Sequence, residues 1–174
     1  MANELRIQKL FAYDPAADVL DSLNIRILSE LEQDPRLSMA ELGRRVGLSS
    51  PAVTERVRRL EEQGVITGYR LLLNPSALGL PLAAYVRVRP NPGQLPRVAE
   101  LARHIPEVVE CHRVTGEDCF ILKVYFPDME QLEHLLDHFL FYGTTTTSLI
   151  QSSPVPPRSL PLPASESSRS GPRD

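Results

Sequence analysis

Hydroxyl and guanidinium side chains gather within one short stretch of the sequence, GLSSPAVTERVRRL. Ser49, Ser50 and Thr54 can donate hydrogen bonds to phosphate oxygens or to base edges. Arg58 and Arg59 can contact a phosphate backbone, or guanine through two parallel hydrogen bonds. These residue types favour recognition of a polyanion, and of double-stranded DNA in particular.

The charge distribution supports this chemistry, although the 174-residue chain has a net charge of -3. Residues 44–70 hold six arginines and only three acids. An acidic protein can bind a polyanion when its positive charges lie on one face, and its low overall charge should limit binding to random DNA or RNA. The residues that we expect to contact DNA are Ser49, Ser50, Pro51, Thr54, Glu55, Arg56, Arg58, Arg59 and Arg70.

Two helices are expected before this stretch. Apolar residues repeat at three- and four-residue steps over residues 19–31, which predicts a helix with one apolar face. Asp34 should end this helix, because a residue before proline is disfavoured in the helical conformation. Ser38 can cap a second helix, which Gly47 should end in a left-handed conformation. The inner face of the second helix is predicted to comprise Met39, Leu42 and Val46.

The stretch itself is predicted to form a third helix, with Ser49 or Ser50 as its N-cap and a proline in its first turn. Two helices that are joined by a glycine-containing turn and packed against a further helix form a helix-turn-helix. The last helix of this motif offers its free N-terminal amides to phosphate. Gly64 should end this helix, and the following VITGYRLLL predicts a strand that could form a wing up to Arg70. The predicted inner face of the third helix comprises Val53, Val57 and Leu60.

An alternative stays open from spacing alone. A three-helix bundle with arginines on its outside is common, and the sequence ERVRRLEEQ is also typical of ordinary charge pairing at four-residue steps. Under that interpretation the residues Glu55, Arg58, Arg59 and Glu62 only solvate the helix surface.

The second half of the chain alternates strand and helix patterns in the order βαββαβ, which is the ferredoxin-like arrangement. The predicted strands are LGLPLAAYVRVRP, EVVECHRVTG, CFILKVYF and TTTTSLIQSS, and the predicted helices are GQLPRVAELARHI and DMEQLEHLLDHFL. The last helix should be capped by Asp128 and should turn Leu132, Leu135, Leu136, Phe139 and Leu140 inward. The helices cover one sheet face, so the other face must bind something, most simply a second copy of the chain.

The predicted fold class is therefore α+β, with an N-terminal winged helix-turn-helix and a C-terminal ferredoxin-like domain. The predicted division is an N-terminal arm at 1–17, the DNA-binding domain at 18–68, a linker strand at 69–77, the ferredoxin-like domain at 78–153 and a tail at 154–174. The tail is rich in proline and serine, so we expect it to be extended or disordered.

Location and redox state follow from two further features. No apolar run approaches the roughly 18 residues of a membrane span, and the N-terminus lacks a signal pattern, so we expect a cytoplasmic protein without a membrane partner. Cys111 and Cys119 lie in apolar, strand-like segments. They are expected to be reduced thiols in the core, without a disulfide.

Three segments together resemble the Lrp/AsnC (feast/famine) transcription regulators over about residues 19–153. They are LDSLNIRILSELEQDPRLSMAELGRRVGLSSPAVTERVRRLEEQGVITGYRLLLNPSALGL, PEVVECHRVTGEDCFILKV and GTTTTS. The resemblance implies a bacterial or archaeal regulator that binds a pseudo-palindromic operator. It also implies a homodimer formed through the sheet, further assembly to a tetramer or octamer, and control by an amino acid or related small metabolite.

The resemblance also places the effector site at a loop and a strand, comprising Gly116, Asp118, Thr144, Thr145, Thr146, Thr147 and Ser148. Amides beside a glycine and a row of hydroxyls suit a carboxylate, and Asp118 suits an ammonium group. Alternatively, Gly116 makes a hairpin turn that Asp118 caps, and the threonines simply favour a strand. The segment before the threonines is shorter than is usual in the family, which leaves open which threonine faces the pocket.

The sequence offers two other kinds of chemistry. His134 and His138 lie one helical turn apart, as in a two-histidine metal site, but they lie opposite the apolar face and indicate a solvated surface. The predicted two-domain architecture also resembles that of siroheme decarboxylases, so an enzyme acting on a tetrapyrrole is the alternative function. We expect no catalytic residues, no metal and no cofactor besides the effector.

Overall fold

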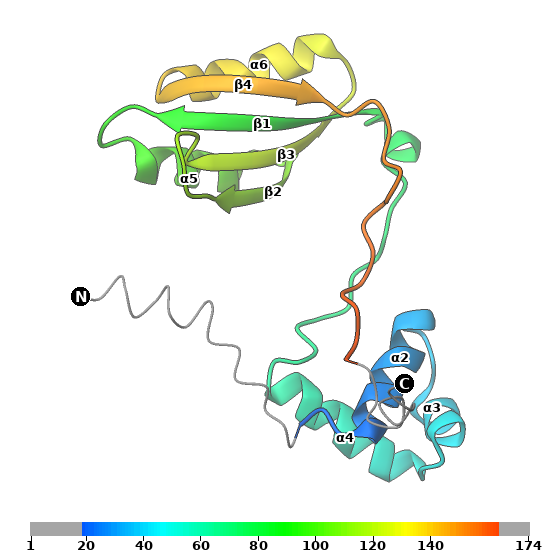
Figure 1. Ribbon diagram of the computed structural model, residues 1–174. Coiled ribbons are helices and arrows are strands. Elements are labelled where there is room, and N and C mark those ends of the chain that lie inside the picture. Colours follow the sequence, from blue (N-terminus) through cyan, green and yellow to red (C-terminus); the bar gives the residue numbers. More distant parts are fainter. Residues whose placement is uncertain (1–18, 164–174) are drawn as a thin grey trace, which may run out of the picture. The chain divides into compact units, whose positions relative to one another are not determined.

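The computed structural model describes residues 19–163 of the chain. The predicted arm at 1–17 and the end of the predicted tail, 164–174, lie outside the described residues. The chain divides into two compact units, which are described separately (Figure 1). Of the described residues, one unit comprises 19–70 together with 157–163, and the other comprises Leu71–Pro156.

The first unit contains the predicted helices: α2 at Ser22–Gln33, α3 at Met39–Val46 and α4 at Ser50–Glu62. Each begins at a side chain that accepts a hydrogen bond from a backbone N–H of its own first turn. Asp21 caps α2 and Ser38 caps α3, as their short polar side chains favour. For α4 the N-cap is Ser49, which settles the choice that the sequence left between two serines.

Buried apolar side chains from all three helices form the core of this unit, and they include the predicted inner residues of α4. Met39 of α3 is only partly buried. The turn between α3 and α4 depends on two glycines. Gly47 ends α3 with a φ of 77°, and a Cβ added to Gly43 would lie 2.7 Å from the carbonyl oxygen of Leu48. The buried core residues are Ile27, Leu31, Leu42, Val46, Val53, Val57 and Leu60.

The segment after α4 differs from its prediction. Residues 64–74 contain no strand, so neither a β-wing nor a linker strand forms, and the next element is a short 3-10 helix, η1, at Pro75–Leu78. The side chains of Leu71, Leu72 and Leu73 are 59% to 78% exposed. The strand prediction was wrong because apolar β-formers become a strand only beside a partner strand, and the described part of the chain, 19–163, places none next to this segment.

The second unit has the predicted βαββαβ order and forms one antiparallel sheet in the order β2-β3-β1-β4. Both helices lie on the same side of the sheet (Figure 1). They pack against alternate strand residues such as Val86 and Leu122, and the opposite sheet face stays uncovered. The elements are β1 at Leu82–Pro90, α5 at Leu95–His104, β2 at Val108–Arg113, β3 at Phe120–Phe126, α6 at Met129–Leu140 and β4 at Gly143–Leu149.

Several predicted core residues of this unit are not fully buried, among them the half-buried Leu136. Cys111 is exposed and Cys119 is half-buried, because Cys111 lies on the edge strand β2 and Cys119 precedes β3. Leu140 is 53% exposed because it is the last residue of α6 and extends past the core. The cap at Asp128 and the buried positions Leu132, Leu135 and Phe139 are as predicted.

Among residues 19–163, no helix combines the length and the apolar composition that crossing a membrane requires.

Candidate functional site

The outer side of α4 exposes most of the residues expected to contact DNA. Ser49, Pro51, Thr54, Arg58 and Arg59 are exposed, while Ser50 and Glu55 are half-buried. The hydroxyl of Ser49 accepts a hydrogen bond from Ala52 N at 3.4 Å, and that of Thr54 donates to the Ser50 carbonyl at 2.8 Å. The two hydroxyls therefore stabilise the first turn and leave oxygen lone pairs on the surface. Arg70 is exposed in the segment after α4.

Glu55 joins the two arginines of this surface. Its carboxylate accepts hydrogen bonds from Arg58 at 2.8 and 2.9 Å and from Arg59 at 2.9 Å. Hydrogen bonds from Arg58 and then Arg59 lower the pKa of Glu55 to about 2. Arg58 also pairs with Glu62, and these carboxylates raise the pKa of the guanidinium. The pairing at three- and four-residue steps is thus present on the same surface that exposes the arginines, and it partly neutralises their charge.

Arg56 points to a different part of the unit. Its Nη1 lies 2.7 Å from Asp21 Oδ2 and 3.0 Å from Asn24 Oδ1. Asn24 is only 8% exposed, and its Nδ2 donates to the Val19 carbonyl at 2.6 Å. The structure therefore separates Arg56 from the Glu55, Arg58 and Arg59 cluster and connects it to the start of α2.

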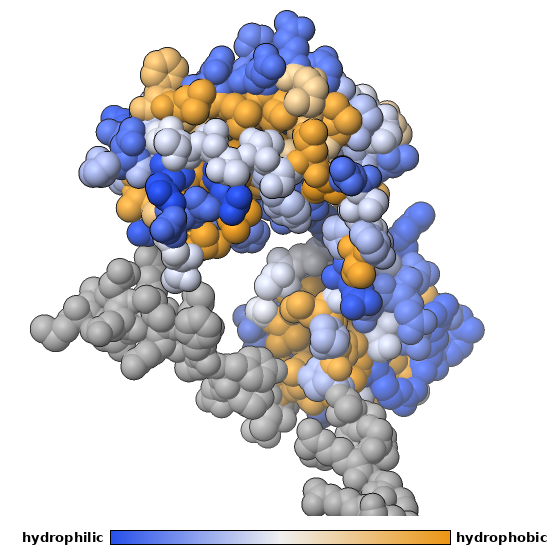
Figure 2. Space-filling model, turned by 45° about the horizontal axis from the view of Figure 1, so that its top comes forward, coloured by the Kyte–Doolittle hydropathy of each residue, from blue (hydrophilic) through white to orange (hydrophobic). Residues whose placement is uncertain are grey.

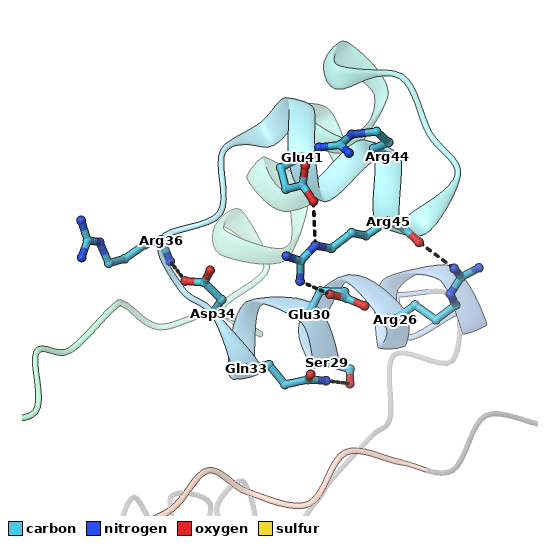
Figure 3. A network of polar contacts seen from close by, with 9 residues as sticks. All are labelled: Arg26, Ser29, Glu30, Gln33, Asp34, Arg36, Glu41, Arg44 and Arg45. Atoms are coloured by element: carbon cyan, nitrogen blue, oxygen red, sulfur yellow. Dashed lines mark hydrogen bonds and ion pairs between the residues drawn. The ribbon is translucent and has the colours of Figure 1, made fainter.

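A second polar network connects α2 to α3 (Figure 3). Arg45 reaches Glu30 of α2 and Glu41 of α3, each at 3.0 Å, and Arg26 of α2 donates to the Arg45 carbonyl at 3.0 Å. Strongly hydrophilic residues gather on one side of the helical unit, beside an apolar area (Figure 2). Helix α2 is thus bonded by polar side chains to both helices of the predicted motif, and it fixes their relative orientation.

The β4 register separates the threonines that the sequence could not distinguish. Thr144 lies opposite Arg89 and Thr146 opposite Arg87, whereas Thr145 and Thr147 lie opposite Val88 and Val86, which are buried under the helices. Directly paired residues share a sheet face. The uncovered face therefore presents Thr144, Thr146 and Ser148, which are exposed, while Thr145 and Thr147 are half-buried on the helix side.

Two arginines of β1 connect the two parts of the predicted effector site, which are the β2–β3 loop and strand β4. Arg87 Nη1 lies 3.4 Å from Asp118 Oδ2, and Arg89 pairs with Glu117. Asp118, Glu117 and the exposed Gly116, with a φ of 109°, belong to the β2–β3 loop. Sequence reasoning missed both arginines, although their alternation with buried valines in AAYVRVRP places them on the uncovered face.

The uncovered face has a polar centre. Lys123 of β3 is 9% exposed, and its Nζ lies 3.6 Å from Glu110 Oε1 and 5.7 Å from the centre of the Tyr125 ring. His112 Nε2 lies 3.7 Å from the other oxygen of Glu110. A lysine with so little contact with water, on a face that no helix covers, indicates a surface already close-packed with side chains.

The histidines considered for metal binding are on the surface of α6. His134 lies 4.0 Å from Glu130, and Nδ1 of His138 is hydrogen-bonded to the His134 carbonyl at 2.7 Å. Within residues 19–163 no three His, Cys, Asp or Glu side chains are grouped as a metal site. His104 and His112 are likewise exposed, on α5 and β2.

Comparisons with known proteins match each of the two units to a protein family. A winged helix-turn-helix DNA-binding family matches residues 20–67, and the Lrp/AsnC ligand binding domain family matches residues 83–160. The chain is 37% identical over 133 residues to the transcriptional regulator LrpC of Bacillus subtilis (strain 168), covering 76% of this chain and 92% of that protein. It is 43% identical over 125 residues to the leucine-responsive regulatory protein of Escherichia coli (strain K12), covering 70% of this chain and 76% of that protein.

Solved structures agree with this assignment. Bacillus subtilis LrpC superimposes with a TM-score of 0.74 at 36% identity, covering 77% of this chain and 96% of that chain. A transcriptional regulator from Neisseria meningitidis in complex with L-methionine gives a TM-score of 0.75 at 31% identity, covering 82% and 97%. Because the relatives are regulators, the tetrapyrrole enzyme alternative has no support. The chain belongs to the Lrp/AsnC family of helix-turn-helix transcriptional regulators.

Proposed function

We propose that the chain regulates transcription by placing the first turns of α4 in the major groove of an operator. Arg58 and Arg59 contact phosphates or guanine, and Ser49, Ser50, Pro51 and Thr54 lie against the backbone and base edges. Glu55 binds both arginines until DNA competes for them, and Arg70 reaches a neighbouring phosphate. For Arg56 we propose a positioning role, because Asp21 and Asn24 already hold its guanidinium.

One observation carries this proposal. Helix α4 buries Val53, Val57 and Leu60 on one face and exposes two arginines on the other. Its residue Arg56 forms polar bonds to the start of α2, and these bonds fix the orientation of α4. A recognition helix needs an exposed basic face and a fixed orientation. DNase footprinting on genomic fragments tests the proposal, with protected half-sites expected about 10 base pairs apart or at multiples of that spacing.

We also propose that a second copy covers the open sheet face. That face carries exposed Tyr85, the nearly buried Lys123 and charges of both signs, and the helices leave it uncovered. Symmetric pairing of two such faces gives a homodimer whose two α4 helices read a pseudo-palindromic site, and further assembly gives tetramers or octamers. Sedimentation equilibrium tests this assembly, and a lone monomer at micromolar concentration would oppose it.

The effector that we propose is an amino acid or a related small metabolite, bound near Gly116, Asp118 and the exposed residues of β4. A related regulator has been solved with L-methionine, which supports this ligand class. A thermal-shift screen of the twenty amino acids tests it, since a hundredfold excess over the dissociation constant stabilises by about 2.7 kcal/mol. This proposed role needs no catalytic chemistry, and we propose a cytoplasmic location because the operator DNA lies there.

A further inference from the structure

A groove of about 490 Å³ runs beside helix α4 within the helical unit. One side of it comprises Thr54, Val57, Arg58 and Glu61, which recur at the three- and four-residue steps of one helix face and extend over about 10 Å. A hollow of this size is typical of sites for small molecules. All of its lining residues belong to the helical unit, so the groove is separate from the candidate effector site of the sheet unit.

Most of the groove is lined by apolar side chains. Leu31, near the end of α2, and Val57 are only 7% and 5% exposed. Leu37 and Met39, around the start of α3, are half-buried. Tyr69 lines the groove from the segment after α4 and is 55% exposed. Apolar side chains around an open hollow favour a ligand with an apolar body.

The two charged residues of the lining differ in how well they are paired. The guanidinium of Arg58 is already bonded to Glu55 and Glu62. Among residues 19–163, the side-chain partner of Glu61 is the Tyr69 hydroxyl, which donates to Glu61 Oε1 at 3.1 Å. Partial burial raises the pKa of that hydroxyl, and the bond to Glu61 raises it further, so the tyrosine stays a donor at neutral pH. One carboxylate oxygen of Glu61 is thus left to bind a cation.

We propose that this groove binds a primary amine with an apolar body. The ammonium group donates to Glu61 and lies beside the Tyr69 ring, where the face of an aromatic ring also attracts a cation. The apolar body packs on Leu31, Met39 and Val57. The charge of the ligand thus complements the least paired charge of the lining, and its body covers the apolar side chains.

The groove shares two residues with the proposed DNA surface. Thr54 and Arg58 line the groove and are also expected to contact the operator. A bound amine therefore occupies one edge of that surface and weakens operator binding. By linkage, operator DNA must weaken amine binding by the same factor. This coupling rests on the proposed DNA function, whereas binding of the amine to the groove does not.

Methionine methyl groups provide a direct probe of the groove in the full chain. The chain has three methionines, of which Met39 lines the groove and Met129 begins α6 in the other unit. In protein labelled with ¹³C at the methionine methyl groups, hexylamine should shift the Met39 resonance saturably and leave that of Met129 unchanged. The variant Met39→Leu assigns the resonance.

Two matched ligands separate the contributions of body and charge. Methylamine lacks the apolar body and should bind at least about tenfold more weakly than hexylamine. Hexan-1-ol lacks the positive charge and should bind about three- to tenfold more weakly, because water at this open site limits the strength of an ion pair. Methylamine also controls for the effect of added salt on operator binding.

The variant Glu61→Gln tests the residue that is proposed to bind the ammonium group. It should weaken hexylamine binding by about three- to tenfold and leave the affinity for hexan-1-ol unchanged, which a general disturbance of the groove would not do. Glu32→Gln is the matched control, because Glu32 is an exposed carboxylate of α2 that does not line the groove. Thermal unfolding confirms that both variants are folded.

Operator affinity is measured in parallel, with and without hexylamine. Saturating hexylamine should lower it in wild type and in Glu32→Gln, and the same concentration should have less effect on Glu61→Gln. Amine binding that leaves operator affinity unchanged would overturn the coupling. Absence of operator binding without any amine would instead contradict the proposed DNA function, while the Met39 titration still decides whether the groove binds amines.

Three results would overturn the amine site itself. The first is a Met39 resonance that does not shift saturably with hexylamine, which would leave the groove to a protein segment as its occupant. The second is hexan-1-ol or methylamine binding as tightly as hexylamine. The third is equal hexylamine affinity of Glu61→Gln and wild type.

Discussion

Arg56 Nη1 and Asp21 Oδ2 lie 2.7 Å apart although 35 positions separate them in the sequence. Asp21 caps α2, and the same guanidinium bonds Asn24, so one side chain of the recognition helix is joined to the first turn of the scaffold helix. The basic surface of α4 is therefore held in place by an arginine that does not belong to that surface.

Arg56→Ala should lower the free energy of unfolding of the helical unit by about 1 kcal/mol, because it leaves Asn24 and Asp21 without a shared donor. Operator affinity should fall through loss of orientation. The slope of log affinity against log salt should stay constant, since no phosphate contact is lost. Arg59→Ala is the contrasting variant and should reduce that slope by about one unit. An equal drop in slope for Arg56→Ala would show that Arg56 itself contacts phosphate.

Glu55→Gln should increase affinity for non-specific DNA. The change removes a negative charge that holds Arg58 and Arg59, and it lets both guanidinium groups reach phosphate. We expect a gain of roughly tenfold at low salt, or about 1.4 kcal/mol, which shrinks as salt rises. Fluorescence anisotropy with random duplexes measures it, and Glu100→Gln on α5 is the control. Unchanged non-specific affinity would mean that the carboxylate does not restrain the arginines.

The Asp21 network should make stability sensitive to acid. Partial burial opposes ionisation of Asp21, but hydrogen bonds from Arg56 and from the Asn24 N–H outweigh it and hold the pKa below its ordinary value of 3.8. The stabilisation is therefore complete above that ordinary value and is lost as pH falls through the lowered pKa. Urea unfolding of wild type and Asp21→Asn should differ most near pH 7 and converge in acid. A gap independent of pH would refute this linkage.

Gly43→Ala should disrupt the turn between α3 and α4. An added Cβ would meet the Leu48 carbonyl oxygen at 2.7 Å and the Ser49 carbonyl carbon at 3.4 Å, and both are backbone atoms. We expect a loss of about 1 to 3 kcal/mol in the free energy of unfolding and weaker operator binding. Arg44→Ala, at an exposed neighbouring position, should change stability by less than about 0.5 kcal/mol. Equal stability of Gly43→Ala and wild type would show that the backbone of the turn can shift to accommodate the added methyl group.

The sequence predicted the elements that depend on periodic burial. Residues 19–31 repeat at the helical period and become α2, and the valines of AAYVRVRP alternate and become buried positions of β1. The caps at Ser38 and Asp128 were predictable because a short polar side chain before an apolar repeat satisfies free backbone amides.

What depends on tertiary neighbours could not be predicted in the same way. The segment VITGYRLLL has strand composition but finds no partner strand within residues 19–163, and Cys111 falls on an edge strand that the sequence does not mark as one. The pairing of Arg87 with Asp118 requires the order β2-β3-β1-β4, which brings a loop and a distant strand together. Arg56 was placed on the DNA surface because its position on the helix flank fits both roles.

The most direct test of the central claim is a quantitative footprint of one operator with wild type, the double variant Arg58→Gln/Arg59→Gln and the control Arg97→Gln. Wild type and the control should protect two half-sites about 10 base pairs apart, or a multiple of that, while the double variant stays folded and loses protection. Equal protection by the double variant, or no sequence preference by wild type, would contradict recognition of DNA through α4.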